Sequence, residues 1–157
     1  MSFKKADKTV RKHFATAMRQ EDVAHAAIEI TRALGMEKDN TLFSHSTCPD
    51  EINHDDGDIT DCLRDNFNGQ FSLGGLAGIP FSGKTGFAAY ASHVPDEGNI
   101  FVLFAPHIAI SDEGKVGFYH RRGQKELTAA CGAAIGAYNS VEHLHAPPEV
   151  DIFSRDA

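Results

Sequence analysis

The chain has 157 residues and a mass of 17.0 kDa, with 41% apolar and 24% charged residues, a composition typical of a soluble globular domain. Its formal charge of −7 and its pI near 5.6 argue against nucleic acid or an anionic membrane surface as the main partner. No segment approaches the roughly 20 apolar residues that cross a bilayer, so we expect a cytoplasmic protein.

The first forty residues are predicted to be helical. One helix can begin near Asp7, and a second begins at the acidic pair of residues 21–22, whose charges favour a helix N-terminus. Apolar residues of the second helix recur at three- and four-residue steps and form one stripe: Val23, Ala27, Ile30 and Leu34. Gly35 is expected to end this helix. We therefore predict N-terminal helices over about residues 7–35, ahead of a core over about residues 40–138.

Two segments of the core are predicted to be strands that end near reactive side chains. Residues 41–47 are short and β-prone, which places Cys48 at the end of a strand. Residues 99–105 are a continuous apolar run between a glycine and a proline, which is typical of a strand buried on both faces. His107 lies just beyond this run. Ligands and catalytic groups favour such strand ends in parallel α/β sheets.

The remaining core segments are predicted to be short. Residues 59–63 favour a short helix, and residues 112–115 favour a turn. After that turn, residues 116–120 are predicted to return as an antiparallel strand. Residues 126–138 are rich in alanine and are predicted to form a buried helix that carries Cys131.

Two thiols and one imidazole have the chemistry of a metal site. Cys48, His107 and Cys131 can together hold zinc and leave its fourth position open for water, which is the pattern of catalytic zinc. Their spacing matches no short zinc-finger pattern, and each residue alone also fits a packing role, since cysteine behaves as a small hydrophobe. Asp50 can orient a metal-bound water through a hydrogen bond. It can equally be a solvated loop acid or an acid at a helix N-terminus.

Residues 78–85 match the phosphate-loop pattern G-x-x-x-x-G-K-[ST]. A proline and a phenylalanine interrupt the loop that would bind the phosphate. The segment that follows is too short and too soon broken for a typical helix. We therefore prefer a tightly packed turn that lines a pocket beside the metal. Four other histidines are candidates for proton transfer, because imidazole titrates near neutrality. His45 and His54 are loop or surface candidates, and His143 and His145 alternate, so both can face one side of an extended segment.

Six blocks of sequence, in this order, resemble the limiting CO2-inducible protein B family, which includes the theta-type carbonic anhydrases. These blocks are residues 48–53, 71–81, 83–87, 93–95, 104–108 and 131–133. The resemblance spans about residues 40–138. It implies one α/β domain over residues 1–157, similar to β-type carbonic anhydrases, with a mostly parallel central sheet flanked by helices. It also implies a homodimer.

The resemblance further implies zinc as the cofactor, with Cys48, His107 and Cys131 as its ligands. Asp50 would be the catalytic carboxylate that contacts zinc-bound water. The β-type pattern places an arginine two residues after this aspartate, where the present chain has Ile52. The arginine that pairs with the aspartate must then come from elsewhere, and the candidates are Arg19, Arg32, Arg64, Arg121 and Arg122.

The activity implied is the reversible hydration of CO2 to bicarbonate by zinc-bound hydroxide. CO2 would lie against Phe and Leu side chains of residues 71–87 and against the dimer partner. Two other functions stay open. A zinc hydrolase would use the same site on a small ester, amide or anhydride. A non-catalytic member would bind CO2 or bicarbonate, or assemble with partners, with its fourth zinc position blocked.

Overall fold

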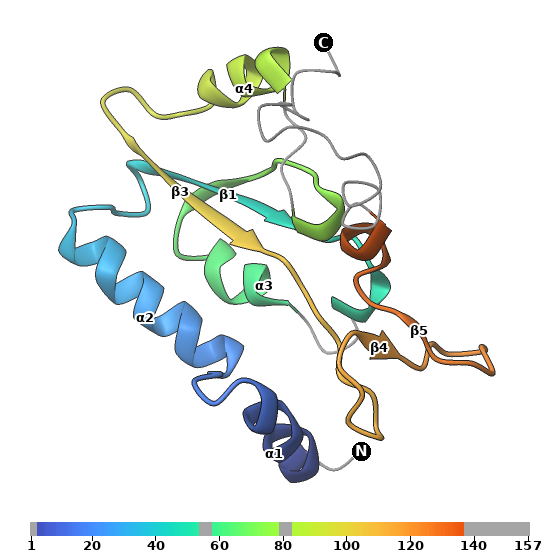
Figure 1. Ribbon diagram of the computed structural model, residues 1–157. Coiled ribbons are helices and arrows are strands. Elements are labelled where there is room, and N and C mark those ends of the chain that lie inside the picture. The colour runs from blue at the N-terminus through green and yellow to red at the C-terminus, as the bar shows by residue number, and fades with distance from the viewer. Residues whose placement is uncertain (1–2, 54–57, 79–82, 137–157) are drawn as a thin grey trace, which may run out of the picture.

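The protein is a small α/β domain, seen in a computed structural model that describes residues 3–53, 58–78 and 83–136 (Figure 1). Its helices are α1 (Phe3–His13), α2 (Gln20–Ala33), α3 (Ile59–Arg64) and α4 (Gly83–Ala91), with 3-10 turns η1 (Glu51–Asn53) and η2 (Leu76–Gly78). Its strands are β1 (Thr41–Thr47), β2 (Asn68–Ser72), β3 (Asn99–Ala105), β4 (Phe118–Tyr119) and β5 (Thr128–Ala129). None of the described helices has the length and apolar character that spanning a bilayer requires.

Three parallel strands form the central sheet, in the order β2-β1-β3. β1 lies between two neighbours, and most of its residues are buried. Its register places Thr47, the last residue of β1, opposite Ala105, the last residue of β3. The segments that begin at Cys48 and Pro106 therefore leave the same edge of the sheet side by side, as the parallel arrangement requires.

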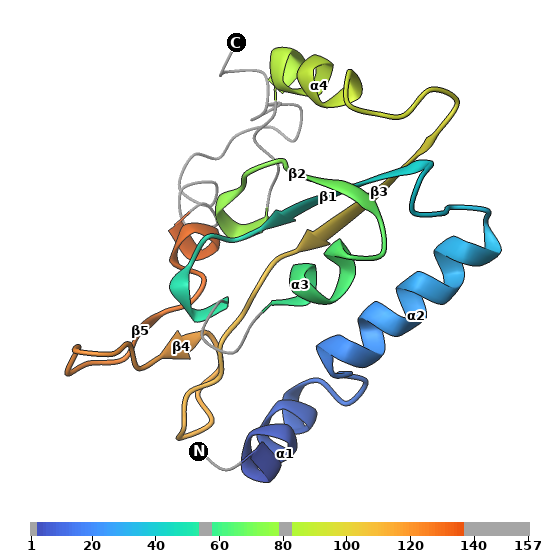
Figure 2. The ribbon, with the colours of Figure 1, turned by 180° about the vertical axis from the view of Figure 1, so that it is seen from behind.

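Helices cover the two faces of the sheet with different partners. α2 and α3 lie on one face and α4 lies toward the other (Figures 1 and 2). Phe43 of β1 packs with Leu63 and Phe67 on the first face, and Leu42 packs with Tyr90 of α4 on the second. Successive strand residues point to opposite faces, so one strand supplies both cores. Full burial of each such side chain contributes about 1.5–3 kcal/mol.

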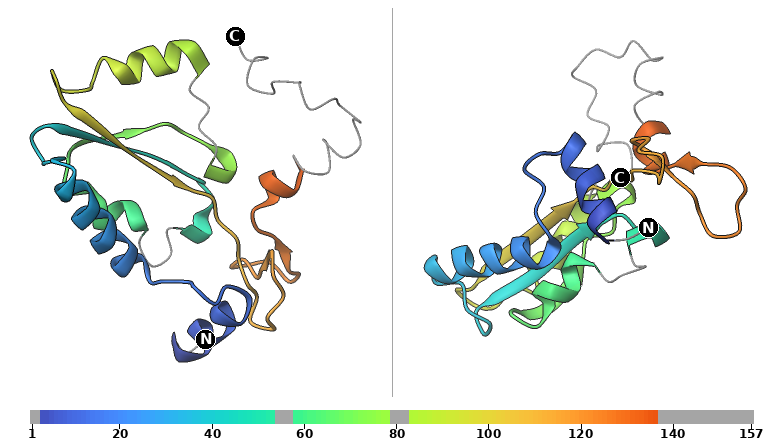
Figure 3. Two further views of the ribbon diagram at one scale, coloured as in Figure 1. Left: turned by 60° about the vertical axis from the view of Figure 1, so that its left-hand side comes forward. Right: turned by 90° about the horizontal axis from the view of Figure 1, so that it is seen from below.

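A second, two-stranded sheet extends beyond the carboxyl ends of the main strands. β4 and β5 pair antiparallel, with Tyr119 opposite Thr128. Figure 3 shows this ribbon projecting from the body of the sheet. The chain leaves β3, runs out through the ribbon and returns at Cys131, which brings a distant residue back to the end of β1.

The N-terminal prediction is right about two helices but wrong about which face of the second packs inward. α1 begins at Phe3 rather than near Asp7. Of the predicted stripe, Ile30 and Leu34 are 62% and 71% exposed, and Val23 is also exposed. α2 instead buries chiefly Ala24 and Thr31, with partly buried Ile28 beside them. Ala27 is the one member of the predicted stripe that packs against this core. Small side chains let α2 pack closely against α3, which a stripe of larger residues does not. Gly35 has a φ of +75° just past the helix, as predicted.

The prediction for residues 99–105 has the correct bounds but the wrong burial. β3 is an edge strand, and Ile100 and Phe104 are 43% and 55% exposed. The run is apolar on both faces, yet within the described residues one face is only partly covered.

Residues 126–138 do not form one helix. Thr128 and Ala129 belong to β5, because their backbone groups pair with β4. Helical backbone begins only at residue 132, one residue after Cys131, and its described part runs to residue 136. The returning strand predicted at residues 116–120 is reduced to β4 and a bridge from Ile110 to Val116, and its main partner is β5.

Two shorter predictions have different outcomes. The predicted helix at residues 59–63 is confirmed as α3. The segment after Gly83, expected to be too broken for a typical helix, forms the nine-residue α4. The phosphate-loop pattern begins at Gly78, inside the η2 turn rather than after a strand. Its residues 79–82 lie outside the described residues, as do His54, His143 and His145.

Candidate metal centre

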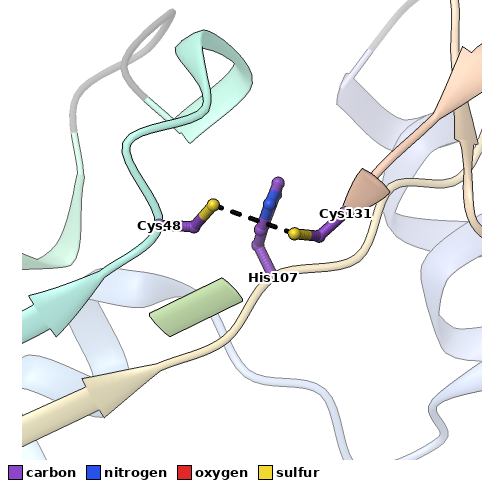
Figure 4. Close-up of side chains that lie close together, drawn as sticks. All are labelled: Cys48, His107 and Cys131. Atoms are coloured by element: carbon purple, nitrogen blue, oxygen red, sulfur yellow. Dashed lines mark hydrogen bonds between the residues drawn. The ribbon is translucent and has the colours of Figure 1, made fainter. Parts of the chain in front are cut away.

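Three side chains predicted as metal ligands lie together at the carboxyl edge of the sheet (Figure 4). Ligand atoms of Cys48, His107 and Cys131 all lie within 4.8 Å of one another, and the two Sγ atoms are 3.8 Å apart. Two sulfurs bound to a tetrahedral zinc ion at about 2.3 Å each would lie about 3.8 Å apart. The spacing of the thiols therefore fits one shared metal ion.

The imidazole of His107 supplies a second test of the fit. Its side chain is 10% exposed, and both ring nitrogens are buried without a hydrogen-bond partner among the described residues. A buried polar atom left unpaired costs about 1–3 kcal/mol, so such atoms normally have a partner. A metal ion bound between the two sulfurs and the ring would provide one.

The protein backbone holds the first thiol in place. The backbone N–H of Ala77 donates a hydrogen bond to Cys48 Sγ at 3.3 Å, and the Asn53 side-chain amide donates to the Cys48 carbonyl at 2.6 Å. Ala77 adopts a φ of 59° to do this, a left-handed conformation that is unusual for a residue with a Cβ. These two hydrogen bonds fix the position of the Cys48 sulfur at the candidate centre.

Close backbone packing holds the histidine segment. A Cβ added to Gly78 would lie 2.8 Å from the backbone nitrogen of Pro106, the residue before His107. Gly78 also has a φ of +74°. Only glycine lets the η2 turn press against the end of β3 in this way. The described part of the glycine-rich segment before residue 79 is thus a tight turn beside the candidate centre, which agrees with the alternative that we preferred to a phosphate loop.

Asp50, the predicted catalytic residue, lies beside the three ligands and pairs with an arginine. Its Oδ2 is 2.7 Å from Arg121 Nη2 and 3.8 Å from His107 Nε2. The side chains of Asp50 and Arg121 are only 12% and 16% exposed, so water weakens their attraction less than at an open surface. Arg121 is therefore the arginine, among the five candidates, that pairs with Asp50. Of the other candidates, Arg32 donates a hydrogen bond to Asn66 and Arg64 donates one to Asp61.

The surroundings of Arg121 stabilise its positive charge. Burial works against the charge, but the hydrogen bonds and Coulomb attraction from Glu51 and Asp50 outweigh burial and raise the pKa of the guanidinium above its ordinary value. The arginine is a permanent cation that holds a carboxylate next to the candidate metal ligands. Sequence reasoning left Arg121 as one of five arginines, although its place at the end of a predicted strand was a usable signal.

A cavity of about 420 Å³ opens beside the thiols and the Asp50–Arg121 pair. Its walls mix polar and apolar groups: Cys48, Pro49, Asp50, Glu51, Leu76, Arg121, Gln124, Thr128, Ala129, Cys131, Gly132 and Ala133. Within the part of the chain that the structure describes, Leu76 is the one wall residue from the segment 71–87 that was expected to contact CO2. The residues of β5 and the loop before it were not anticipated, because their approach depends on the β4–β5 pairing.

Comparison with known proteins identifies the family and the fold of the chain. The family model of the limiting CO2-inducible proteins B/C beta carbonic anhydrases matches residues 17–151. The chain belongs to this family. The resemblance seen in the sequence is thus confirmed, as is the α/β fold with a parallel sheet flanked by helices.

Solved structures of one relative show the same fold. PtLCIB4, a homolog of the limiting CO2-inducible protein LCIB, is 33% identical with a TM-score of 0.74, over 92% of this chain and 60% of that chain. A histidine-to-alanine variant of PtLCIB4 is 32% identical with a TM-score of 0.76, over 90% and 57% of the two chains. Its serine-to-arginine variant is 31% identical with a TM-score of 0.71, over 92% and 61%. The present chain therefore spans about 60% of the length of this relative. A comparison with curated proteins finds no match.

Proposed function

We propose that this member of the family is a zinc-dependent carbonic anhydrase that hydrates CO2 reversibly to bicarbonate. The observation that carries the proposal is the group of Cys48, His107 and Cys131, with a sulfur separation of 3.8 Å and a buried imidazole without a partner. Two thiols, one imidazole and an adjacent carboxylate suit zinc, which takes nitrogen and sulfur ligands. Bound zinc would supply Lewis-acid chemistry, which lowers the pKa of water to about 7 and so provides a nucleophile at neutral pH.

Asp50 and Arg121 would orient the reacting water. An ionised carboxylate only accepts hydrogen bonds, and Arg121 occupies one acceptor position on Oδ2. Asp50 can then accept a hydrogen from water, which directs a lone pair of that water toward the carbon of CO2. The exposed side chain of Leu76 offers an apolar wall for CO2 in the cavity. The product proton leaves to buffer or to a histidine.

Stopped-flow CO2 hydration by the zinc-loaded protein tests the proposal. We expect one zinc per chain and catalysis well above buffer. Asp50→Asn and Arg121→Gln should each lower kcat by about 10–100-fold, the usual effect of removing a group that orients metal ligands or water. Arg122→Gln, at the exposed neighbouring arginine, is the matched control and should keep wild-type activity. Hydration by the wild type no faster than buffer would reject the proposal.

The same preparation separates the two alternative functions. A zinc hydrolase would cleave a small ester, such as 4-nitrophenyl acetate, with little CO2 hydration. A non-catalytic member would bind one zinc per chain and turn over neither substrate.

We also propose that the protein is a homodimer in solution. Ile100 and Phe104 lie four residues apart on β3, so they project from the same face of an edge strand, and both are exposed. Exposed apolar side chains gathered on one face are typical of protein interfaces. Charge favours a second copy as the partner. The first 20 residues hold six Lys or Arg and one acidic residue, a net +5, so the other 137 residues carry −12.

A further inference from the structure

One carboxylate oxygen of Asp50 lies between Arg121 and His107. Oδ2 accepts a hydrogen bond from Arg121 Nη2 at 2.7 Å and lies 3.8 Å from His107 Nε2. Two nitrogen or oxygen ligands on a tetrahedral zinc, at about 2.0–2.1 Å each, lie about 3.4 Å apart. A short movement would therefore let Asp50 itself become the fourth ligand. In the structure Asp50 stands outside the three-residue group whose ligand atoms lie within 4.8 Å of one another.

The orientation of the Arg121 guanidinium is set by contacts of Nε and Nη1, the two nitrogens that do not bond Asp50. Nε donates to Glu51 Oε1 at 2.7 Å, and Nη1 donates to Thr128 Oγ1 at 2.6 Å and to the Ala129 carbonyl at 3.2 Å. The guanidinium is a rigid planar fork, so holding Nε and Nη1 fixes where Nη2 points. Nη2 then points at Asp50.

Thr128 is well placed to hold the fork. It lies on β5, opposite Tyr119 in the β4–β5 ladder, and Arg121 follows β4 by two residues. Its Oγ1 donates a long hydrogen bond to the Tyr119 carbonyl at 3.5 Å, which leaves its lone pairs for Arg121. The ladder therefore fixes both the arginine backbone and the hydroxyl that receives its side chain.

Of the two side chains that hold the Arg121 guanidinium, Glu51 has the weaker effect and Thr128 the stronger. Its side chain is 67% exposed, compared with 16% for Arg121. An ion pair with one partner so exposed is screened by water and contributes little. The hydroxyl of Thr128, which lies in a partly buried contact, should have the larger effect on Arg121.

We propose that Thr128, with help from Glu51, is a positioning residue that keeps the fourth metal position open. By orienting Arg121 it holds Asp50 on the arginine and off the metal. Without the hydroxyl, Arg121 can turn away and Asp50 can move onto the metal, where it would block the site. This inference rests on the metal centre of the proposed function.

Cobalt substitution tests the inference without measuring turnover. Cobalt(II) bound to thiolates absorbs in the near ultraviolet, which reports metal loading, and its visible bands respond to the fourth ligand. Azide, a small anion, is the probe for an open position. We expect wild type to bind azide and Thr128→Val, which keeps the shape but lacks the hydroxyl, to bind it at least 10-fold more weakly at equal cobalt loading. Thr128→Ser should bind azide as wild type does.

The double variant Thr128→Val with Asp50→Asn tests whether Asp50 on the metal causes the weaker azide binding of Thr128→Val. An asparagine side chain is a poor metal ligand, so azide affinity should return to within about threefold of wild type. Glu51→Gln should weaken azide binding less than Thr128→Val does. Wild-type azide affinity in Thr128→Val, or no recovery in the double variant, would overturn the inference while leaving the metal centre intact. Failure of the wild-type protein to take up cobalt at all would overturn both the inference and the proposed function.

Discussion

At the scale of single residues, the two buried thiols at the candidate centre differ from the third cysteine in their surroundings. Cys48 and Cys131 are 1% and 5% exposed and lie close together, with His107 nearby. Cys62 lies on α3 and packs against the core of Phe43 and Leu63. Cys62 therefore serves as a control thiol that packs in the core, outside the candidate ligand group.

Cys131→Ser should lower zinc affinity by more than about 100-fold, because losing a ligand costs at least as much as losing its supporting hydrogen bond. Cys62→Ser should keep one zinc per chain. Competition with a chromophoric chelator measures both affinities. Retention of tight zinc binding by Cys131→Ser would remove this residue from the ligand set.

His45 makes a prediction about stability and pH. It lies within β1, partly buried, and its ring contacts Thr47 and Gln70, so it is not the loop or surface residue that we expected. Burial lowers the pKa of His45 from its ordinary value of 6.5, and Asp58 opposes this only in part. The unfolded chain then binds a proton at His45 more readily than the folded protein does.

Stability contributed by neutral His45 should be complete above pH 6.5 and should decline as the pH falls toward the lowered folded-state pKa. His45→Gln should remove this part of the pH dependence. Urea unfolding of both proteins at several pH values between about 5 and 8 measures it. Parallel stability curves for variant and wild type across this range would contradict the prediction.

At the scale of elements, the η2 turn controls how closely two segments of the site approach. Gly78→Ala adds both a left-handed conformation, which costs about 1–3 kcal/mol, and an overlap with the backbone of residues 105–106. Gly35→Ala is a matched control, since Gly35 has a φ of +75° but no atom within 4 Å of an added Cβ.

Both glycine variants should have a lower Tm than wild type, and Gly78→Ala should lose more. Only Gly78→Ala should also bind zinc more weakly, because the overlap displaces the segment that carries His107. Thermal unfolding and zinc titration provide the two measurements. Equal losses in both variants, with zinc affinity unchanged, would mean that the close approach of η2 does not position the histidine.

Local pattern predicted some elements well and others poorly. The predicted bounds of the strands at residues 41–47 and 99–105 were correct to the residue, because short β-prone runs between turn residues rarely adopt another structure. The helix predicted for the alanine-rich segment around Cys131 was wrong because Thr128 and Ala129 pair with β4, a tertiary contact that overrides helix propensity. The predicted buried face of α2 was wrong because close packing against α3 and the core around Phe43 favours small residues over larger apolar ones.

At the scale of the whole molecule, the exposed face of β3 predicts association. Phe104→Asp places a charge where the proposed homodimer would bury an aromatic ring, so it should shift the protein toward monomer. Leu34→Asp, at an exposed position near the end of α2, should leave association unchanged. Analytical ultracentrifugation over a range of concentrations distinguishes the two species. A wild-type protein that stays monomeric at all concentrations would exclude the homodimer.

The amino-acid sequence alone determined the fold class, the two main strands at the site and the residue types of the candidate centre. These follow from local periodicity, from side-chain chemistry and from blocks of residues typical of one family. The tertiary structure alone decided that Cys131 returns to Cys48, and that Arg121 rather than four other arginines meets Asp50. These pairs join residues 83 and 71 positions apart, respectively. Their meeting depends on strand pairing and close backbone packing, which no local pattern encodes.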